Sequence, residues 1–310
     1  MNKLAVLGPN PAWQKTLFFQ SFTKGAVNRA RRMDELASGK GINFCRALSC
    51  AKKSSFTLIQ FSGGDNGAKL DAALKSSGME FISVKVSGPT RCCTTCLDEK
   101  AQMMTEIIEP SFPASAAEVD AMLGSFEEVL KEVSGAAFCG SLPDGTDPAL
   151  YIRAAKLAGA YKVPLLIDAR RDLDEVFAAG AEIILKINRE ELAELSGLQD
   201  PLEGLRSLFS RFANLKYAAI TDGPGKAFAA DGSQIAFYTL PELKFIASPL
   251  GCGDTASAIL LSEICSGKDI FTAFRYALAA ASANCLNPTP GKFDPAEAEK
   301  LLPDLEYSVL

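Results

Sequence analysis

The sequence predicts an α/β fold in which a parallel sheet is covered by helices on both faces. Short apolar runs recur along the chain, and longer stretches with a helical period separate them. Such alternation is typical of strand–helix–strand units. We expect strands at Lys3–Gly8, Phe56–Phe61, Gly135–Gly140, Val163–Asp168, Glu182–Ile187 and Tyr217–Thr221.

The helices are predicted from the spacing of their apolar residues. In Ala114–Val133 the apolar residues that follow a helical period are Val119, Met122, Leu123, Phe126, Val129 and Leu130. The same period predicts helices at Asp147–Lys162, Pro201–Leu215, Gly251–Ser266 and Asp269–Cys285. A shorter helical stretch, Phe44–Lys52, follows a glycine-rich turn.

Two segments, Thr16–Leu36 and Thr90–Glu109, break this pattern. Both contain alternating, β-prone residues without an intervening crossover helix. We expect them to pair as a small antiparallel sheet that projects from the main domain. Such a sheet could close over a site at the carboxyl ends of the parallel strands, where open α/β sheets bind ligands.

Charge and hydropathy exclude several classes of protein. The 310 residues include 32 Lys and Arg and 37 Asp and Glu, and the net charge of −5 comes without a long basic run. Nucleic acid is therefore not an expected partner. The first apolar run, Leu4–Leu7, is too short for a signal peptide, and no stretch approaches the ~18 apolar residues of a membrane span. We expect a cytoplasmic protein with no membrane partner.

The chain contains nine cysteines and no histidine. The odd number and scattered positions of the cysteines indicate reduced thiols. Cys92, Cys93 and Cys96 cluster, but neither a second pair nor a histidine completes a zinc site, so a metal or redox role is the weaker alternative there. Without histidine, Ser-His-Asp and Cys-His mechanisms are excluded. A general base must be a carboxylate, Lys, Tyr or Cys.

The most informative motif is Gly251-Cys252-Gly253-Asp254, a glycine-rich turn that leads into an apolar helix. Glycines allow close approach of the backbone, and the free N–H groups at a helix start favour phosphate oxygens. Asp254 stands where it could accept a proton from a nucleophilic hydroxyl. The alternative is that Asp254 only caps the helix, which Asp does well.

A second glycine-rich turn, Ser38-Gly39-Lys40-Gly41-Ile42-Asn43, also precedes a helical stretch. It is not a P-loop, because Asp34 and Gly41 stand where the Walker pattern needs Gly and Ser or Thr. The functional interpretation places its amides and Asn43 against sugar hydroxyls. The alternative is a helix start with a solvated lysine.

Two further segments, Lys186–Glu191 and Thr221–Lys226, follow predicted strands at the end where α/β proteins bind ligands. Each alone is weak evidence, because charged residues after a strand usually form a solvated helix start. Gly223 and Gly225 lack the third glycine of a dinucleotide fingerprint, so a nicotinamide cofactor is not supported.

Together and in this order, these segments resemble the PfkB/ribokinase family of carbohydrate kinases, most closely its branch of 1-phosphofructokinases and tagatose-6-phosphate kinases. The resemblance runs nearly end to end, and Gly140-Ser141-Leu142-Pro143-x-Gly145 is another segment typical of this branch. It implies an anion hole formed by the amides of Gly251, Cys252 and Gly253, with Asp254 as the base.

The resemblance also implies the remaining contacts of the two substrates. It assigns ATP binding to Lys186, Asn188, Thr221, Gly223, Gly225 and Asn284, and a Mg²⁺ role through water to Glu191. It assigns the sugar to Gln14, Ser38, Gly39, Lys40, Asn43 and Ser141, and the phosphate already on the sugar to Arg29 and Arg91. The alternative for each arginine is a surface charge on an exposed sheet.

The fold that the resemblance implies is a ribokinase-like, three-layer α/β/α Rossmann-like domain spanning residues 1–310. Its small β-sheet lid would comprise residues of about 12–36 and 88–110, in agreement with the two anomalous segments. In the family the lids commonly pair into dimers, so a homodimer is a possible assembly.

One residue departs from the pattern of the family. The branch usually has N-P-A-x-D after the first strand, whereas Asn10-Pro11-Ala12-Trp13-Gln14 has a neutral amide in place of the sugar-binding Asp. Gln can both donate and accept hydrogen bonds, so the choice of sugar is open.

The expected activity is transfer of the γ-phosphoryl group of MgATP to a phosphorylated ketohexose of the fructose 1-phosphate or tagatose 6-phosphate type. The alternatives are a kinase of an unphosphorylated sugar or nucleoside, and a sugar-phosphate-binding protein without turnover.

Overall fold

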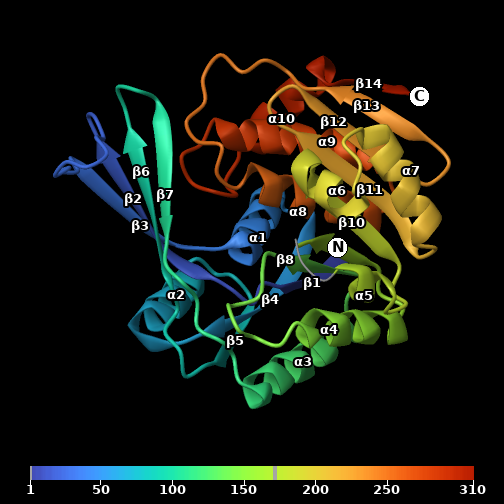
Figure 1. Ribbon diagram of the computed structural model, residues 1–310, viewed down its shortest axis with the longest axis horizontal. Coiled ribbons are helices and arrows are strands. Elements are labelled where there is room, and N and C mark those ends of the chain that lie inside the picture. Colours follow the sequence, from blue (N-terminus) through green and yellow to red (C-terminus); the bar gives the residue numbers. More distant parts are fainter. Residues whose placement is uncertain (1, 170–172) are drawn as a thin grey trace.

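The computed structural model describes residues 2–169 and 173–310. Within these residues the strands form a ten-stranded sheet and a separate four-stranded sheet (Figure 1). The large sheet consists, in spatial order, of β5 (Phe81–Lys85), β4 (Ser54–Ser62), β1 (Asn2–Leu7), β8 (Gly135–Cys139), β9 (Leu165–Asp168), β10 (Ile183–Asn188), β11 (Leu215–Asp222), β12 (Lys226–Ala230), β13 (Ile235–Thr239) and β14 (Glu306–Val309).

The strands from β5 to β11 run parallel, as the sequence predicts. All the predicted strands lie in this part of the sheet. Beyond β11 the sheet is not parallel, because β12, β13 and β14, which were not predicted, continue it in antiparallel register. β11 and β12 are joined by a short turn, and antiparallel neighbours need no crossover helix.

Helices cover both faces of the large sheet, which confirms the three layers. One face carries α3 (Ala116–Leu130), α4 (Ala149–Ala160), α5 (Leu173–Phe177), α6 (Arg189–Ser196) and α7 (Pro201–Arg211). The other carries α1 (Lys40–Ala51), α2 (Gly64–Ser76), α8 (Cys252–Cys265), α9 (Ile270–Cys285) and α10 (Pro295–Leu301), which a short 3₁₀ turn (Leu302–Asp304) follows. Alternate residues of each central strand enter the two cores: in β1, Leu4 and Val6 face α8, whereas Ala5 and Leu7 face the opposite layer.

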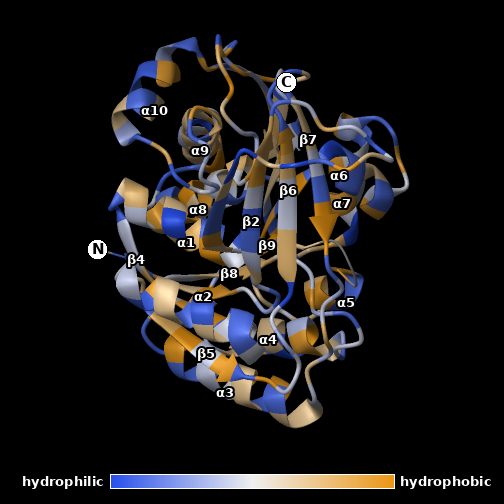
Figure 2. Cartoon of the chain, turned by 90° about the vertical axis from the view of Figure 1, so that its left-hand side faces the viewer, coloured by the Kyte–Doolittle hydropathy of each residue, from blue (hydrophilic) through white to orange (hydrophobic). Residues whose placement is uncertain are grey.

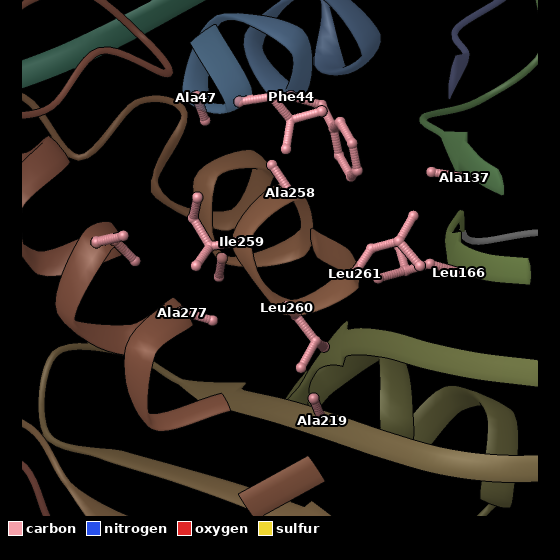
Figure 3. Packing of buried hydrophobic residues seen from close by; sticks show 14 of the residues in the cluster. Phe44, Ala47, Ala137, Leu166, Ala219, Ala258, Ile259, Leu260, Leu261 and Ala277 are labelled. Atoms are coloured by element: carbon pink, nitrogen blue, oxygen red, sulfur yellow. The ribbon is translucent and has the colours of Figure 1, made fainter. Parts of the chain in front are cut away.

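Helix α8 lies at the centre of its layer. Its residues Ala258, Ile259, Leu260 and Leu261 lie between α1, α9 and the sheet (Figure 3). A helix that is buried on all sides is apolar all round, and the run from Ala258 to Leu261 has that character. The first turn of α8 is therefore held on a rigid element.

The small sheet contains, in spatial order, β3 (Arg32–Ser38), β2 (Ala12–Phe19), β6 (Cys92–Asp98) and β7 (Met103–Ile108). It projects from the main body at the left of Figure 1. The predicted antiparallel pairing is confirmed for β2 with β3 and for β6 with β7. It is wrong for the central pair, because β2 and β6 are parallel. The chain leaves this sheet after β3 and returns only after β5, so the direction of β6 is not set by a hairpin turn.

The small sheet contains the two cysteines of the C-x-x-C pattern, and their positions on β6 decide whether they can bind a metal ion together. Cys93 and Cys96 lie three residues apart on β6, and side chains alternate along a strand, so the two point to opposite faces of the sheet. They cannot bind one metal ion together in this conformation. Figure 2 shows the small sheet facing the viewer. Two apolar side chains on β7 are exposed to solvent, Ile107 by 54% and Ile108 by 56%.

None of the helices within residues 2–169 and 173–310 is long and apolar enough to cross a membrane.

Replacing Leu260 by Ala should lower the free energy of unfolding by about 2–5 kcal/mol, because a fully buried leucine leaves a cavity among α1, α9 and the sheet. Urea unfolding followed by circular dichroism measures the change. The matched control is Leu198→Ala, since Leu198 is 36% exposed and a surface substitution changes stability by about 0.5 kcal/mol or less. Equal losses in the two variants would contradict the central position of α8.

Candidate active site

The carboxyl ends of the parallel strands and the first turns of α1 and α8 meet at one place. Gly251 precedes α8 with a φ of 79°, and a Cβ there would lie 2.5 Å from the Gly291 nitrogen. Only glycine fits both the left-handed conformation and the close contact. The first amides of an α-helix have no partner within the helix and carry the positive end of its dipole. The turn can therefore hold an anion.

Asp254 lies in the first turn of α8 and is 8% exposed. Its Oδ2 accepts a hydrogen bond of 2.8 Å from Nδ2 of Asn43 on α1. Burial and then the negative charge of Asp168 raise the pKa of Asp254 to about 6, against the opposing effects of Lys40 and Asn43. Asp254 does not act as the side-chain cap of α8, which has none. The capping alternative for this residue is therefore not supported.

Arg46 fixes the orientation of the Asn43 amide. Its Nη1 donates to the Asn43 Oδ1 at 2.9 Å and to the Pro290 carbonyl at 2.6 Å. Because the amide oxygen is held by the guanidinium, the amide nitrogen faces Asp254. Sequence reasoning missed Arg46, since the contact between α1 and the Pro290 loop spans more than two hundred residues.

Asp168, the last residue of β9, joins the two helices to the sheet. Its carboxylate accepts hydrogen bonds from Lys40 Nζ at 2.6 Å and from the Ser257 hydroxyl on α8 at 2.7 Å. Lys186 Nζ lies 3.9 Å from the same group. Burial alone would raise the pKa of Asp168, but the charges of Lys40 and Lys186 lower it to about 2. Sequence reasoning also missed this residue, although its place at the end of a predicted strand was a usable signal.

A cavity opens beside Lys40 on the side of the small sheet. Its lining residues are Gly8, Asn10, Pro11, Gly39, Lys40, Gly41, Ile42, Arg91, Cys139, Gly140 and Ser141. Four of the predicted sugar-binding residues, Gly39, Lys40, Arg91 and Ser141, are therefore brought together. Arg91 donates through Nη2 to the Asn10 carbonyl at 3.2 Å, and its buried Nε has no hydrogen-bond partner. A ligand oxygen could satisfy that nitrogen.

The other predicted sugar-binding residues are not all at this cavity. Ser38 and Asn43 lie next to it, with their side chains buried and 3.4 Å apart. Gln14 is 4% exposed, donates to the Thr95 hydroxyl at 2.7 Å and lines a separate hollow. Arg29 is exposed in the loop between β2 and β3 and is not among the lining residues. The roles of Gln14 and Arg29 stay predictions.

Several of the predicted ATP-binding residues lie at the carboxyl ends of β10 and β11. Asn188 and Glu191 form a capping box at the start of α6, in which each side chain accepts a hydrogen bond of 2.9 Å from the backbone of the other. This explains the N-x-x-E spacing structurally. Thr221 pairs in register with Asn188, and Gly223 follows in the turn after β11 with a φ of 63°. Gly225 lies in the same turn.

Asn284 is fully buried beneath the first turn of α8. Its Oδ1 accepts from the Thr255 hydroxyl at 2.9 Å and from the Gly291 amide at 2.8 Å, and its Nδ2 donates to the Leu250 carbonyl at 3.0 Å. In this structure the side chain braces the turn. Its predicted contact with ATP stays a prediction.

Comparison with known proteins identifies the family to which this fold belongs. Residues 3–296 match the description "pfkB family carbohydrate kinase". The chain is 28% identical to a 1-phosphofructokinase of Rhodobacter capsulatus over 89% of this chain and 88% of that one, and 23% identical to a tagatose-6-phosphate kinase of Staphylococcus epidermidis over 96% of both. The crystal structure of phosphofructokinase-2 from Escherichia coli in complex with fructose-6-phosphate has the same fold, with a TM-score of 0.86 at 20% identity over 98% of this chain and 99% of that one. This chain therefore belongs to the pfkB family of carbohydrate kinases, enzymes that transfer a phosphoryl group to an alcohol.

Proposed function

We propose that this kinase transfers the γ-phosphoryl group of MgATP to a hydroxyl of a phosphorylated ketohexose of the fructose 1-phosphate or tagatose 6-phosphate type, with Asp254 as the general base. The observation that carries the proposal is the position of Asp254. Its carboxylate is buried, has a pKa raised to about 6 and lies in the helix turn whose amides suit a phosphoryl group.

The proton transfer follows from this position. At neutral pH the Asp254 carboxylate is mostly ionised and can take the proton of the attacking hydroxyl. The amides of Gly251, Cys252 and Gly253 stabilise the charge that develops on the transferred group, where one such donor contributes about 3–4 kcal/mol. Lys186 stabilises the same negative charge, because its ammonium group lies next to Gly253: a Cβ added to that glycine would be 3.1 Å from Lys186 Nζ.

The residues present fit a magnesium ion that arrives with the nucleotide. Within the described residues no group of three or more Asp, Glu, Cys or His side chains is arranged around one point. Mg²⁺ is commonly bound by one or two carboxylates together with substrate phosphates, and it keeps several waters. Glu191 would hold the ion through water. The ion, when bound, neutralises charge on the phosphates.

Arg91 supports the choice of a substrate that already carries a phosphate. It lines the cavity beside Lys40 with an unpaired, buried Nε, and a guanidinium binds phosphate oxygens well. The names of the relatives, 1-phosphofructokinase and tagatose-6-phosphate kinase, agree with such a substrate. We also propose that the small sheet, with residues of about 12–36 and 88–110, acts as a lid in a single domain and as the contact of a homodimer.

Replacing Asp254 by Asn should lower kcat by about 10²–10⁴, because the positioned base is lost while the fold is kept. ADP release in the presence of fructose 1-phosphate or tagatose 6-phosphate measures the effect. Asp65→Asn is the matched control, since Asp65 also lies in the first turn of a helix but is exposed. Near wild-type turnover in Asp254→Asn would falsify the base assignment.

The activity should depend on pH through Asp254. Because only the ionised carboxylate accepts the proton, kcat/KM should fall as the pH drops through about 6. The hydrogen bond from Asn43 favours the ionised form, so Asn43→Leu should move this limb of the profile to higher pH. A profile that is flat through pH 6 in the wild type, or an unmoved limb in the variant, contradicts the assignment.

Arg91→Ala should raise KM for the phosphorylated sugar by about 10- to 150-fold, which corresponds to ~1.5–3 kcal/mol for a charged hydrogen bond. KM for ATP should stay close to that of the wild type. Arg29→Ala, measured in parallel, tests the second predicted phosphate contact, which lies outside the cavity in this structure. If an unphosphorylated sugar or a nucleoside proves the best substrate, the phosphosugar assignment is wrong.

A further inference from the structure

Two cysteines distant in the sequence meet beside the first turn of α8. Cys252 is the first residue of α8, and Cys285 is the last residue of α9. Their Sγ atoms lie 3.0 Å apart, and both are free thiols that are half-buried. The cluster expected from the sequence was that of Cys92, Cys93 and Cys96, whose thiols are all buried. Contact between Cys252 and Cys285 was not visible from their spacing.

The two thiols differ in how readily they ionise. The hydrogen bond between the two thiols lowers the pKa of Cys285, although burial opposes the effect. The same hydrogen bond, together with burial, raises the pKa of Cys252. The thiolate is the nucleophilic form of cysteine, so the lower pKa favours Cys285 as the sulfur that attacks first.

We propose that Cys252 and Cys285 form an oxidation site that takes a small peroxide or disulfide and closes to an intramolecular disulfide bond. With hydrogen peroxide, the Cys285 thiolate attacks one peroxide oxygen, becomes a sulfenic acid and releases hydroxide, which takes up a proton to form water. The sulfur of Cys252 then attacks the sulfenic sulfur, and a second water leaves. The two thiols lose two protons and two electrons in total, and the peroxide takes these up and is reduced to two waters.

Formation of the disulfide bond would move the anion-binding turn, which consists of Gly251–Asp254 at the start of α8. The sulfurs must move from 3.0 Å to about 2.05 Å apart, which draws the first residue of α8 toward the end of α9. The Cys285 carbonyl also accepts hydrogen bonds from the amides of Ala247 and Ser248, at 2.8 and 3.2 Å, in the loop that leads to α8. A displacement of about 1 Å in a catalytic group can cost ~10²-fold in rate. The oxidised enzyme should therefore turn over more slowly, a consequence that rests on the proposed function.

The experiment treats the full-length reduced protein with hydrogen peroxide and measures intact mass, disulfide-linked peptides and ADP release. We expect loss of the mass of two hydrogen atoms, a peptide linking Cys252 to Cys285, and a fall in kcat of about tenfold or more that dithiothreitol reverses. A different disulfide, or both thiols still free after treatment, overturns the proposal.

Single variants separate this pair from the other cysteines. Cys285→Ser and Cys252→Ala should each prevent the mass change and the loss of activity on oxidation, with every variant compared with its own reduced form. Cys265→Ser is the matched control, because Cys265 is a half-buried cysteine at the other end of α8 whose Sγ contacts the Ser134 carbonyl. This variant should still form the disulfide, and protection by Cys265→Ser equal to that of the pair variants contradicts the site.

The mass readout keeps the two proposals apart. If the disulfide forms and the reduced enzyme phosphorylates no phosphorylated ketohexose, the oxidation site stands and the proposed function fails. If the reduced enzyme is active and the disulfide does not form, the oxidation site fails and the proposed function stands. If the disulfide forms without changing kcat, the coupling to the anion-binding turn is wrong.

Discussion

The buried carboxylate of Asp168 holds the two helices of the site against the sheet. It accepts hydrogen bonds from Lys40 of α1 and from Ser257 of α8, and it lies at the end of the central strand β9. A buried charge is tolerated only when it is paired and hydrogen-bonded, so the three elements have one favourable arrangement. The same negative charge helps to keep a proton on Asp254 at mildly acidic pH. The packing of α1 and α8 against the sheet and the raised pKa of Asp254 therefore both depend on the carboxylate of Asp168.

Helix α8 serves the core and the site at once. Its middle residues are apolar and buried, and Figure 3 shows them between α1, α9 and the sheet. Its polar side chains are satisfied inside the protein, with Thr255 bonded to Asn284 and Ser257 bonded to Asp168. A site on such a helix inherits the rigidity of the core. The charged groups around Asp254 can then act without rearranging.

The sequence predicts the parts of this molecule that depend on local pattern. Strands β1, β4, β8, β9, β10 and β11 and helices α1, α3, α4, α7, α8 and α9 were predicted, with ends that differ by a few residues. Strand β5 and helices α2, α5, α6 and α10 were not predicted. Strands β12, β13 and β14 were missed. They belong to the sheet through their pairing with neighbouring strands, and β14, the partner of β13, comes from the end of the chain. For the same reason an all-antiparallel small sheet was expected, and the parallel contact of β2 with β6 was not.

The site residues also divide into those that a local motif predicts and those that depend on distant segments meeting in space. Asp254 and Lys40 follow glycine-rich turns, and Lys186 lies near the end of a predicted strand; all three were predicted as site residues, and the structure brings them to one place. Arg46 and the contact of Cys252 with Cys285 depend on α1, the Pro290 loop, α8 and α9 meeting in space, which no spacing in the sequence encodes. Asn188 and Glu191 show the reverse case, since a motif read for function also has a complete local explanation as a capping box.

The link between the small sheet and α1 is a single residue. Strand β3 ends at Ser38 and α1 begins at Lys40, so Gly39 alone connects them, and its φ of 116° belongs to a conformation that other residues rarely adopt. A single residue is too short to let β3 slide relative to α1. The remaining freedom between the two elements is rotation about the backbone bonds of Gly39. A rotation of β3 about Gly39 would therefore change the orientation of the start of α1, where Lys40 is bonded to Asp168.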